Sequence, residues 1–310
     1  MARRVRLEYG GAIYHVMNRG DRQEDIVRDD TDRERFVETL GEACRKAEWQ
    51  VHAYCLMRNH FHLVVETPRP NLCAGMQWLL GTYTARFNRR HRLFGHLFSG
   101  RYKSLLVDGS GDGYLRSVCD YVHLNPARAR LLDTEQALRQ YRWSSYPQYL
   151  QPPRRRVAWL RVDRLLGEWD IRQDGTSGRR QFERGMEQRA RQEQELENKD
   201  WRELRRGWCW GAPSFRERLL AMIGERPAEH HYGDEIRESA AQQAERLVQR
   251  QLAAAHWTTI QLKQRRKGDP LKVRIAQQLR QETTVGWKWI AERLHMGHWR
   301  SAANAVRSAR

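Results

Sequence analysis

The sequence lacks the features that would direct a chain to a membrane, to secretion or to a nucleotide-driven reaction. It contains no apolar run of about 18 residues or more, so we expect no transmembrane helix. The first residues, MARRVRLEYGG, are basic but have no apolar segment and no small-residue cleavage site, so no signal peptide is expected. No GxxxxGKS or GxxxxGKT loop is present, so no P-loop nucleotide site is expected. These absences predict a cytoplasmic protein that does not associate with membranes.

Cysteine is scarce and is not arranged for cross-linking. The chain of 310 residues has five cysteines, an odd number, and no CxxC pair. Their wide spacing is typical of reduced thiols that are buried as small hydrophobic residues in a cytoplasmic protein. Fixed-period repeats and low-complexity tracts are also absent, and 40% of the residues are hydrophobic. The chain can therefore bury a sizeable core.

Acidic residues are in deficit. There are 38 Asp and Glu against 56 Lys and Arg, which gives a formal net charge of +18 and a pI near 10.2. Most of the excess is Arg, whose guanidinium matches phosphate geometry and stacks on planar groups. This charge favours a polyanionic partner, chiefly nucleic acid. A merely soluble basic protein is the alternative. An acidic membrane surface is disfavoured because no basic amphipathic helix ends in a clear apolar anchor.

The first half of the chain alternates between strand-like and helix-like apolar patterns. The predicted strands cover residues 12–18, 49–56, 60–66 and 98–107, and the predicted helices cover residues 31–46, 72–90 and 114–124. The order β-α-β-β-α-β, followed by a helix, is that of the ferredoxin-like fold. We therefore predict an α+β domain over residues 1–150, with an antiparallel sheet and helices on one face.

The second half has weaker signals. A QPPRRR motif directly after the first domain indicates a boundary. We predict a helical connecting region over residues 151–265 and a short all-α segment over residues 266–310. The chain is thus expected to consist of a sheet domain followed by helices.

The last predicted helices have the pattern of a DNA-binding motif. Gly297 gives a turn between two short helices, and Arg300, Arg307 and Arg310 lie on the final one. This arrangement is typical of a helix-turn-helix whose last helix enters a DNA groove. An ordinary three-helix bundle is the alternative.

The stretch NHFHLVV places two imidazoles inside a predicted strand. Side chains alternate faces along a strand, so His60 and His62 are expected side by side, about 7 Å apart at the backbone. Phe61 then points into the core. Two convergent imidazoles can bind one divalent metal ion. The alternative is a pair of satisfied core histidines, because a His-x-His match alone is not specific.

A nearby predicted helix offers groups that such a metal site would use. Tyr121 and Asn125 are four residues apart, so they lie on one face of that helix, one turn apart. The carbonyl oxygen of Asn125 could complete a metal shell, and Tyr121 could attack a phosphate whose charge the metal draws off. The alternative is that Tyr121 is a packing or surface residue, like most of the 11 tyrosines.

Five segments follow one another in a recognisable order: YHVMNRG (14–20), AYCLMRNHFHLVV (53–65), FNRRH (87–91), GHLFSGRYKSLLV (95–107) and YVHLNPARARLL (121–132). Together they resemble the REP-associated tyrosine transposases of the histidine–hydrophobic–histidine (HUH) single-tyrosine superfamily. The resemblance covers roughly residues 5–150. The family's usual ending is similar to NPVRAGL, whereas this chain has Arg130 in place of the glycine. That difference puts the geometry of the loop in doubt.

The resemblance implies a site and a reaction. Mg²⁺ or Mn²⁺ would be held by His60, His62 and Asn125, and Tyr121 would be the nucleophile of an HUH endonuclease and strand transferase. Tyr121 would attack single-stranded DNA, form a 5′-phosphotyrosine and release a 3′-OH. Attack by another 3′-OH would rejoin strands without ATP. The DNA would be a hairpin from a repetitive extragenic palindrome, beside a short guide sequence.

Further DNA contacts and the oligomeric state are less closely defined. Arg89, Arg90, Arg101 and Lys103 are candidate contacts to the DNA backbone, with solvated surface charge as the alternative. One tyrosine allows one covalent end per site, so strand exchange needs either two chains or two rounds. A monomer and a homodimer are both compatible with this requirement.

Two other functions stay open at this point. The first is a non-catalytic regulator that binds repetitive palindromes through the helix-turn-helix. The presence of both histidines and Tyr121 argues against it. The second is an RNA-processing protein, because a ferredoxin-like sheet with basic residues also suits RNA. The sequence has no obvious paired-aromatic RNA-binding motif.

Overall fold

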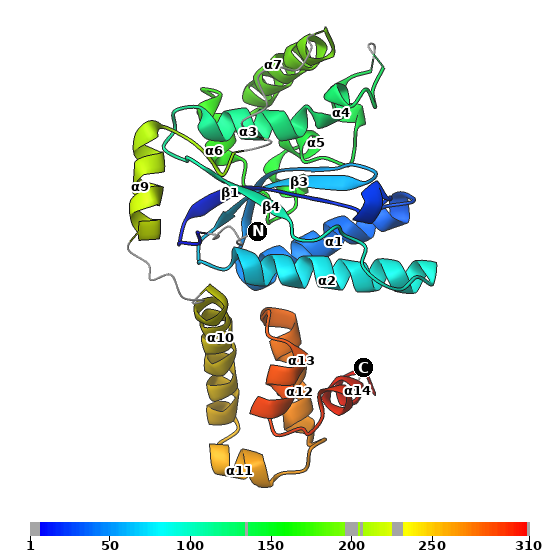
Figure 1. Cartoon of the computed structure of the whole chain (residues 1–310), viewed down its shortest axis with the longest axis vertical. Coiled ribbons are helices and arrows are strands. Elements are labelled where there is room, and N and C mark those ends of the chain that lie inside the picture. The colour runs from blue at the N-terminus through cyan, green and yellow to red at the C-terminus, as the bar shows by residue number, and fades with distance from the viewer. Residues whose placement is uncertain (1–6, 134–135, 196–203, 205–206, 225–231, 309–310) are drawn as a thin grey trace. The chain divides into compact units, whose positions relative to one another are not determined.

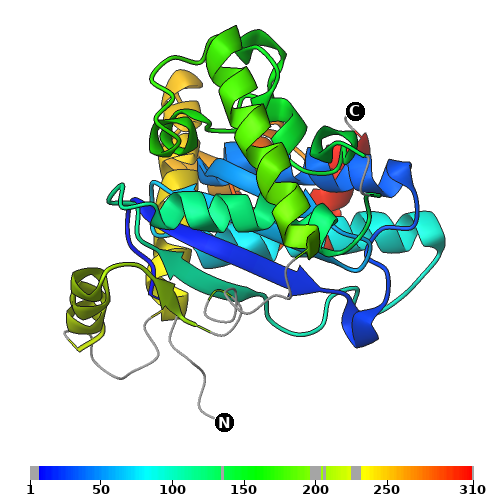
Figure 2. The same cartoon turned by 90° about the horizontal axis from the view of Figure 1, so that it is seen from above.

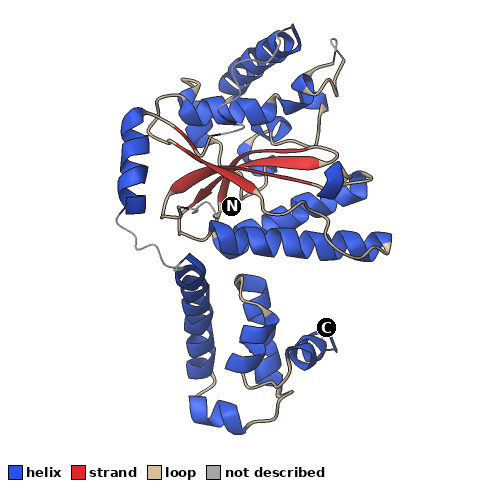
Figure 3. Ribbon diagram, in the orientation of Figure 1, coloured by secondary structure: helices blue, strands red, loops and turns tan. Residues whose placement is uncertain are grey.

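The computed structural model describes residues 7–133, 136–195, 204, 207–224 and 232–308, and its central feature is a five-stranded sheet (Figure 3). The strands are β1 (Ala12–Arg19), β2 (Gln50–Leu56), β3 (His60–Thr67), β4 (Lys103–Val107) and β5 (Cys209–Trp210). They lie in the order β2-β3-β1-β4-β5. The first four pair antiparallel, and β5 is parallel to β4.

The four antiparallel strands have the predicted ferredoxin-like arrangement. The predicted fourth strand is longer than β4, because Phe98 makes only an isolated bridge to Gly20 outside the sheet ladder. β5 was not predicted. It has only two residues, too few for an alternating pattern, and it depends on pairing with a strand about a hundred residues earlier in the chain.

Two long helices cover one face of the sheet, as predicted (Figure 1). They are α1 (Asp30–Ala47) and α2 (Leu72–His91). Phe61 of β3 contacts Phe36 of α1, with ring centroids 5.1 Å apart, and Phe36 contacts Tyr83 of α2 at 5.0 Å. These aromatic rings form the centre of the core on this side, because each is almost fully buried.

The opposite face is also covered by helices, whereas the sequence predicted helices on one face only. These helices are α3 (Tyr114–His123), α4 (Asn125–Arg128), α6 (Asp163–Glu168) and α7 (Thr176–Glu195). Figure 2, seen from above, shows α3 and α7 lying over the sheet. Gly113 precedes α3 with φ +81°, a left-handed conformation that favours glycine. A helix over residues 114–124 was predicted, but not the face of the sheet that it covers.

Shorter elements connect these layers. They are η1 (Asp21–Gln23), η2 (Leu138–Gln140), α5 (Tyr146–Tyr149), η3 (Pro153–Arg155) and α9 (Pro213–Gly224). Tyr149 joins α5 to the sheet, because its hydroxyl donates to the carbonyl of His52 in β2 at 2.6 Å.

The C-terminal helices surround a separate hydrophobic core. They are α10 (Tyr232–Ala254), α11 (Thr259–Gln264), α12 (Pro270–Glu282), α13 (Trp287–Arg293) and α14 (Trp299–Ser308). Leu247, Ile275, Leu279, Ile290 and Val306 belong to this core. The predicted all-α character is therefore found, whereas the helix-turn-helix stays a prediction.

The chain divides into two compact units. One comprises residues 1–44, 48–70 and 79–228, and the other comprises residues 45–47, 71–78 and 229–310. The boundary predicted at residue 150 falls within the first unit, so the scheme of three segments stays a prediction. In the part of the chain that the structure describes, no helix combines the length and the apolar character needed to cross a membrane.

Candidate active site

The two histidines of the NHFHLVV motif lie at the start of β3 and face the same side of the sheet. Their ring centroids are 5.2 Å apart, with the rings nearly perpendicular at 81°. β1 pairs with β3 so that Arg19 lies opposite His60 and Met17 lies opposite His62. Opposite residues of an antiparallel pair point to the same face, so Arg19 and Met17 border the two histidines.

A third imidazole, which the sequence prediction missed, completes a histidine cluster. His15 of β1 stacks on His62, with ring centroids 5.2 Å apart and an angle of 16° between the rings. Nε2 of His15 lies 3.0 Å from Nδ1 of His62, so one nitrogen donates a hydrogen and the other accepts it. Burial lowers the pKa of His15 to about 4, so its ring is neutral at pH 7. The YHVMNRG motif contains His15, but no local pattern indicates a partner 47 residues away.

Neighbouring groups orient His60 and keep it neutral. Its Nδ1 lies 2.8 Å from Oδ1 of Asn59, whose amide nitrogen donates to the carbonyl of Gln23 at 3.1 Å. An amide oxygen only accepts hydrogen bonds, so the hydrogen of His60 lies on Nδ1 and the lone pair on Nε2. Burial, together with the positive charge of Arg19, lowers the pKa of His60 to about 4.

α3 brings Tyr121 to this histidine cluster. The ring centroid of Tyr121 lies 5.6 Å from that of His62 and 5.6 Å from that of His15, with an edge-on geometry in both contacts. Tyr121 is only 4% exposed. The phenol and the imidazoles therefore converge in one place, although Tyr121 is about sixty residues from His62 and about a hundred from His15 in the sequence.

Asn125 and Arg128, which follow Tyr121 in the sequence, both interact with Tyr121. The side-chain nitrogen of Asn125 donates to the carbonyl of Tyr121 at 3.1 Å and of Val122 at 3.4 Å. Its Oδ1 lies 3.5 Å from Nη1 of Arg128. The Arg128 guanidinium lies 4.3 Å from the centroid of the Tyr121 ring, and its Nε donates to Glu193 at 3.1 Å. Arg128 was not among the predicted site residues, although it belongs to the NPARARL motif.

A buried carboxylate fixes the turn of α3 that carries Tyr121. Asp120 accepts hydrogen bonds from Trp169, at 3.2 Å, and from Arg189, and it lies 3.6 Å from Nε of Arg116. Burial raises the pKa of Asp120 to about 6, although the two arginines act in the opposite direction. These bonds link α3 to α7 and so help to hold Tyr121 in position.

The predicted DNA contacts on α2 differ in their surroundings. Arg90 donates to the carboxylates of Asp29 and Asp32, with shortest distances of 2.6 Å to each. Its charge is therefore engaged within the fold. Arg89, one residue earlier, is exposed.

The two predicted contacts near β4 are both exposed. Arg101 lies just before the strand. Lys103 begins the strand and lies opposite Met17 of β1, which in turn lies opposite His62. Lys103 therefore shares a sheet face with the histidine cluster, two strands away or roughly 10 Å.

The predicted DNA contacts of the C-terminal region lie on α14. Arg300 and Arg307 are exposed, whereas Ala302, Ala303 and Val306 face the core. The helix therefore presents a polar, basic side to solvent. Arg310 lies outside the described residues.

The donor set of the cluster suits a divalent metal ion. His60 and His15 are neutral, and the Nε2 atom of His60 keeps its lone pair, which is what metal coordination requires. The amide of Asn125 uses its nitrogen for helix carbonyls, so its oxygen is the atom suited to a metal. Among the described residues, no group of three or more His, Cys, Asp or Glu is placed to hold a metal. The predicted third ligand is accordingly not one of these residue types but the amide oxygen of Asn125.

Comparisons with known proteins found one family and similar solved structures. Residues 9–125 match a family model described as "Transposase IS200 like", which confirms the transposase resemblance seen in the sequence. A solved structure entitled "Structure of the REP associates tyrosine transposase bound to a REP hairpin" matches 51% of this chain and 91% of its own chain, at 14% identity and a TM-score of 0.41. No curated protein matches the chain. The family match concerns residues 9–125 only, which include the histidine cluster and Tyr121.

Proposed function

With residues 9–125 matched to the IS200-like transposases, we propose that this chain cleaves and rejoins single-stranded DNA through a phosphotyrosine at Tyr121. The observation that carries the proposal is the approach of the Tyr121 ring to the His62 ring, with 5.6 Å between centroids. A buried phenol beside the neutral imidazole of His15 is suited to nucleophilic attack on a phosphate held at the same place.

The chemistry conserves phosphodiester bonds. The phenol oxygen of Tyr121 attacks the phosphorus, and the bond to the 3′ oxygen breaks. The products are a 5′-phosphotyrosine and a strand with a 3′-OH. Attack by a 3′-OH on the phosphotyrosine reverses the exchange and joins strands, so no nucleotide is consumed. Arg128, whose guanidinium lies 4.3 Å from the Tyr121 ring, supplies positive charge that favours the approach of the phosphate.

His60, His62 and Asn125 would hold Mg²⁺ or Mn²⁺ in this site. When bound, the ion would draw charge from the phosphate and so lower the barrier to attack. Asn59 keeps the hydrogen of His60 on Nδ1. If Nδ1 of His62 donates to Nε2 of His15 across their 3.0 Å contact, then His15 likewise keeps the hydrogen of His62 on Nδ1. Both Nε2 atoms then carry lone pairs, and groups that orient ligands in this way typically contribute 10–100-fold to metal affinity.

We propose hairpin DNA with a single-stranded flank as the substrate. The net charge of +18 favours a polyanion such as DNA over uncharged or basic partners. Arg89, Arg101 and Lys103 are exposed and available for contacts to the DNA backbone, whereas the charge of Arg90 is already engaged by two carboxylates. Arg300 and Arg307 on α14 would hold the duplex stem in a helix-turn-helix manner.

The test is a covalent adduct with a labelled DNA hairpin in the presence of Mn²⁺, detected on a denaturing gel. The wild-type chain should form the adduct and Tyr121→Phe should not. Tyr114→Phe, which changes the first residue of the same helix, is the matched control and should keep the adduct. An adduct that persists in Tyr121→Phe would contradict the proposal.

The same assay separates the two alternative functions. A non-catalytic regulator would shift the hairpin on a native gel and leave no adduct with any DNA. An RNA-processing protein would act on an RNA hairpin of the same sequence in preference to DNA. Either result would replace the proposed function.

A further inference from the structure

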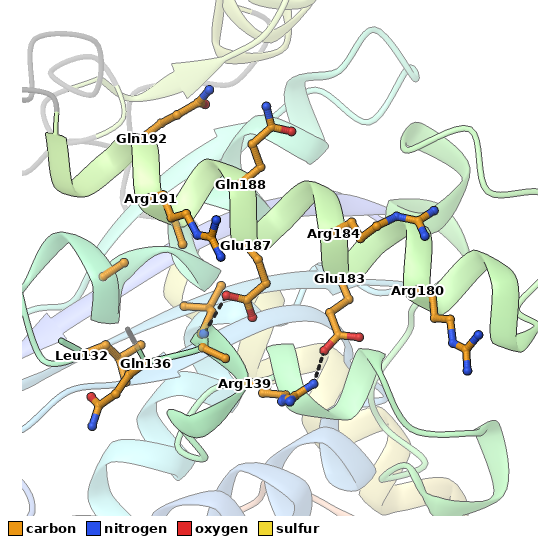
Figure 4. Close-up of a pocket in the computed structure, with 14 residues that line it drawn as sticks. Leu132, Gln136, Arg139, Arg180, Glu183, Arg184, Glu187, Gln188, Arg191 and Gln192 are labelled. Atoms are coloured by element: carbon orange, nitrogen blue, oxygen red, sulfur yellow. Dashed lines mark hydrogen bonds and ion pairs between the residues drawn. The ribbon is translucent and has the colours of Figure 1, made fainter. Parts of the chain in front are cut away.

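A groove lies between α7 and the segment that follows α4. It has a volume of about 740 Å³, with α7 on one side and residues such as Leu132 and Arg139 on the other (Figure 4). Ala127 of α4 also lines it. Ala127 directly precedes Arg128, whose guanidinium contacts the Tyr121 ring, so α4 contributes residues both to the groove and to the candidate active site.

The two carboxylates of the groove are already bonded to protein groups. Glu183 accepts a hydrogen bond from Arg139 at 2.6 Å, as the dashed line in Figure 4 shows. Glu187 accepts from the backbone N–H of Leu138 at 3.0 Å and from the hydroxyl of Tyr146 at 3.4 Å. The negative charges are therefore engaged in holding the two walls of the groove together.

Three arginines of the groove have no ion-pair partner among the described residues. They are Arg180, Arg184 and Arg191, and all three are exposed. Figure 4 shows Arg180 and Arg184 toward one end of α7 and Arg191 toward the other. At a rise of 1.5 Å per residue they span about 16 Å. The groove thus carries a line of available positive charge.

We propose that this groove binds the phosphodiester backbone of the single-stranded DNA that flanks the scissile phosphate. The inference rests on the proposed function, which requires an unpaired strand at Tyr121. A span of about 16 Å fits roughly five stacked nucleotides at 3.4 Å each. Guanidinium forks match phosphate oxygens in a bidentate way. α7 lies outside residues 9–125, so this surface is separate from the matched transposase region.

The test compares two triple variants of the full-length chain that lose the same charge. The groove variant carries Arg180→Gln, Arg184→Gln and Arg191→Gln. The control carries substitutions to Gln at three other exposed arginines outside the groove: Arg154, Arg155 and Arg172. Binding of a 20-nucleotide oligothymidylate and of a 20-base-pair duplex is measured by fluorescence anisotropy over a series of salt concentrations, after circular dichroism has confirmed folding.

We expect the groove variant to bind the oligothymidylate at least about 10-fold more weakly at low salt. Its slope of log Kd against log salt should be shallower by about 2, because three phosphate contacts to a single strand contribute about 0.7 each. The control should change that slope by less than about 0.5. Substitution of the same three arginines by Lys should restore most of the slope.

Other outcomes would overturn the inference. Equal effects of the two triple variants would mean that only the overall charge matters. A loss confined to the duplex would assign the groove to the hairpin stem instead. The outcome for the proposed function is read separately: if the groove variant binds weakly but the wild-type chain never forms the Tyr121 adduct, the proposed function fails while the groove assignment stands.

Discussion

The candidate active site and the helix α14, two of the regions proposed to contact DNA, are built in opposite ways. The histidine cluster and Tyr121 lie between a sheet and a helix, where Tyr121 is 4% exposed and His62 is 3% exposed. Arg300 and Arg307 lie on the exposed side of α14. A reaction at phosphorus needs fixed positions and neutral ligands, and burial supplies both. Attraction to a DNA backbone needs only charge within reach, which exposed side chains supply.

This contrast predicts different sensitivities to substitution. In the buried region each side chain has several partners, so loss of one disturbs the others. On α14 each arginine is expected to act almost independently, through its own charge.

The largest effect is expected from His62→Ala. Loss of a proposed metal ligand should lower the rate of adduct formation by at least about 100-fold. Loss of a residue that only orients a metal ligand typically costs about 10–100-fold in metal affinity or activity. The paired substitution Arg300→Ala with Arg307→Ala should leave that rate within about threefold when DNA is saturating. Single-turnover kinetics measures both, and similar losses would remove the distinction between the two regions.

A pH effect on stability is expected from the buried histidines of the metal-free protein. The pKa of His15 is lowered to about 4 from its ordinary 6.5, so between these values the unfolded chain binds a proton that the folded chain does not. Stability should therefore fall as the pH decreases from 6.5 to 4, by up to roughly 3 kcal/mol for His15. Urea unfolding at several pH values measures it, and His15→Gln should flatten the curve.

His15→Gln should also weaken Mn²⁺ binding, by about 10–100-fold, because His62 loses the group that orients it. Isothermal titration calorimetry measures the affinity. His52→Gln is the matched control. His52 is a buried histidine of β2 that is bonded to Glu66 at 2.9 Å, so its loss should affect stability but not the metal. Unchanged Mn²⁺ affinity in His15→Gln would show that His15 only fills space.

The smallest effects are expected on α14. Arg300→Ala and Arg307→Ala should each weaken duplex binding by about 2–10-fold and reduce the salt slope by about 1. Arg250→Ala, at an exposed position of α10, serves as the control. Equal losses from Arg250→Ala would point to a general charge effect and against a recognition helix on α14.

Much of the site follows from local geometry and was predictable. His60 and His62 share a face because strand side chains alternate. Tyr121, near the end of α3, and Asn125, at the start of α4, are four residues apart and are joined by the hydrogen bond from Asn125 to the Tyr121 carbonyl. Both statements depend only on neighbouring residues. The βαββαβ order likewise follows from local apolar periods, and the four antiparallel strands adopt it.

The sequence by itself therefore determined the elements, their order and the candidate residues within each element. Only the tertiary structure decided that His15 stacks on His62, that α3 lies on the histidine side of the sheet, and that Arg90 is bonded to two carboxylates. The physical reason is that these contacts depend on strand register and helix packing between distant segments. Local periodicity records which side chains are buried, but it does not record their partners.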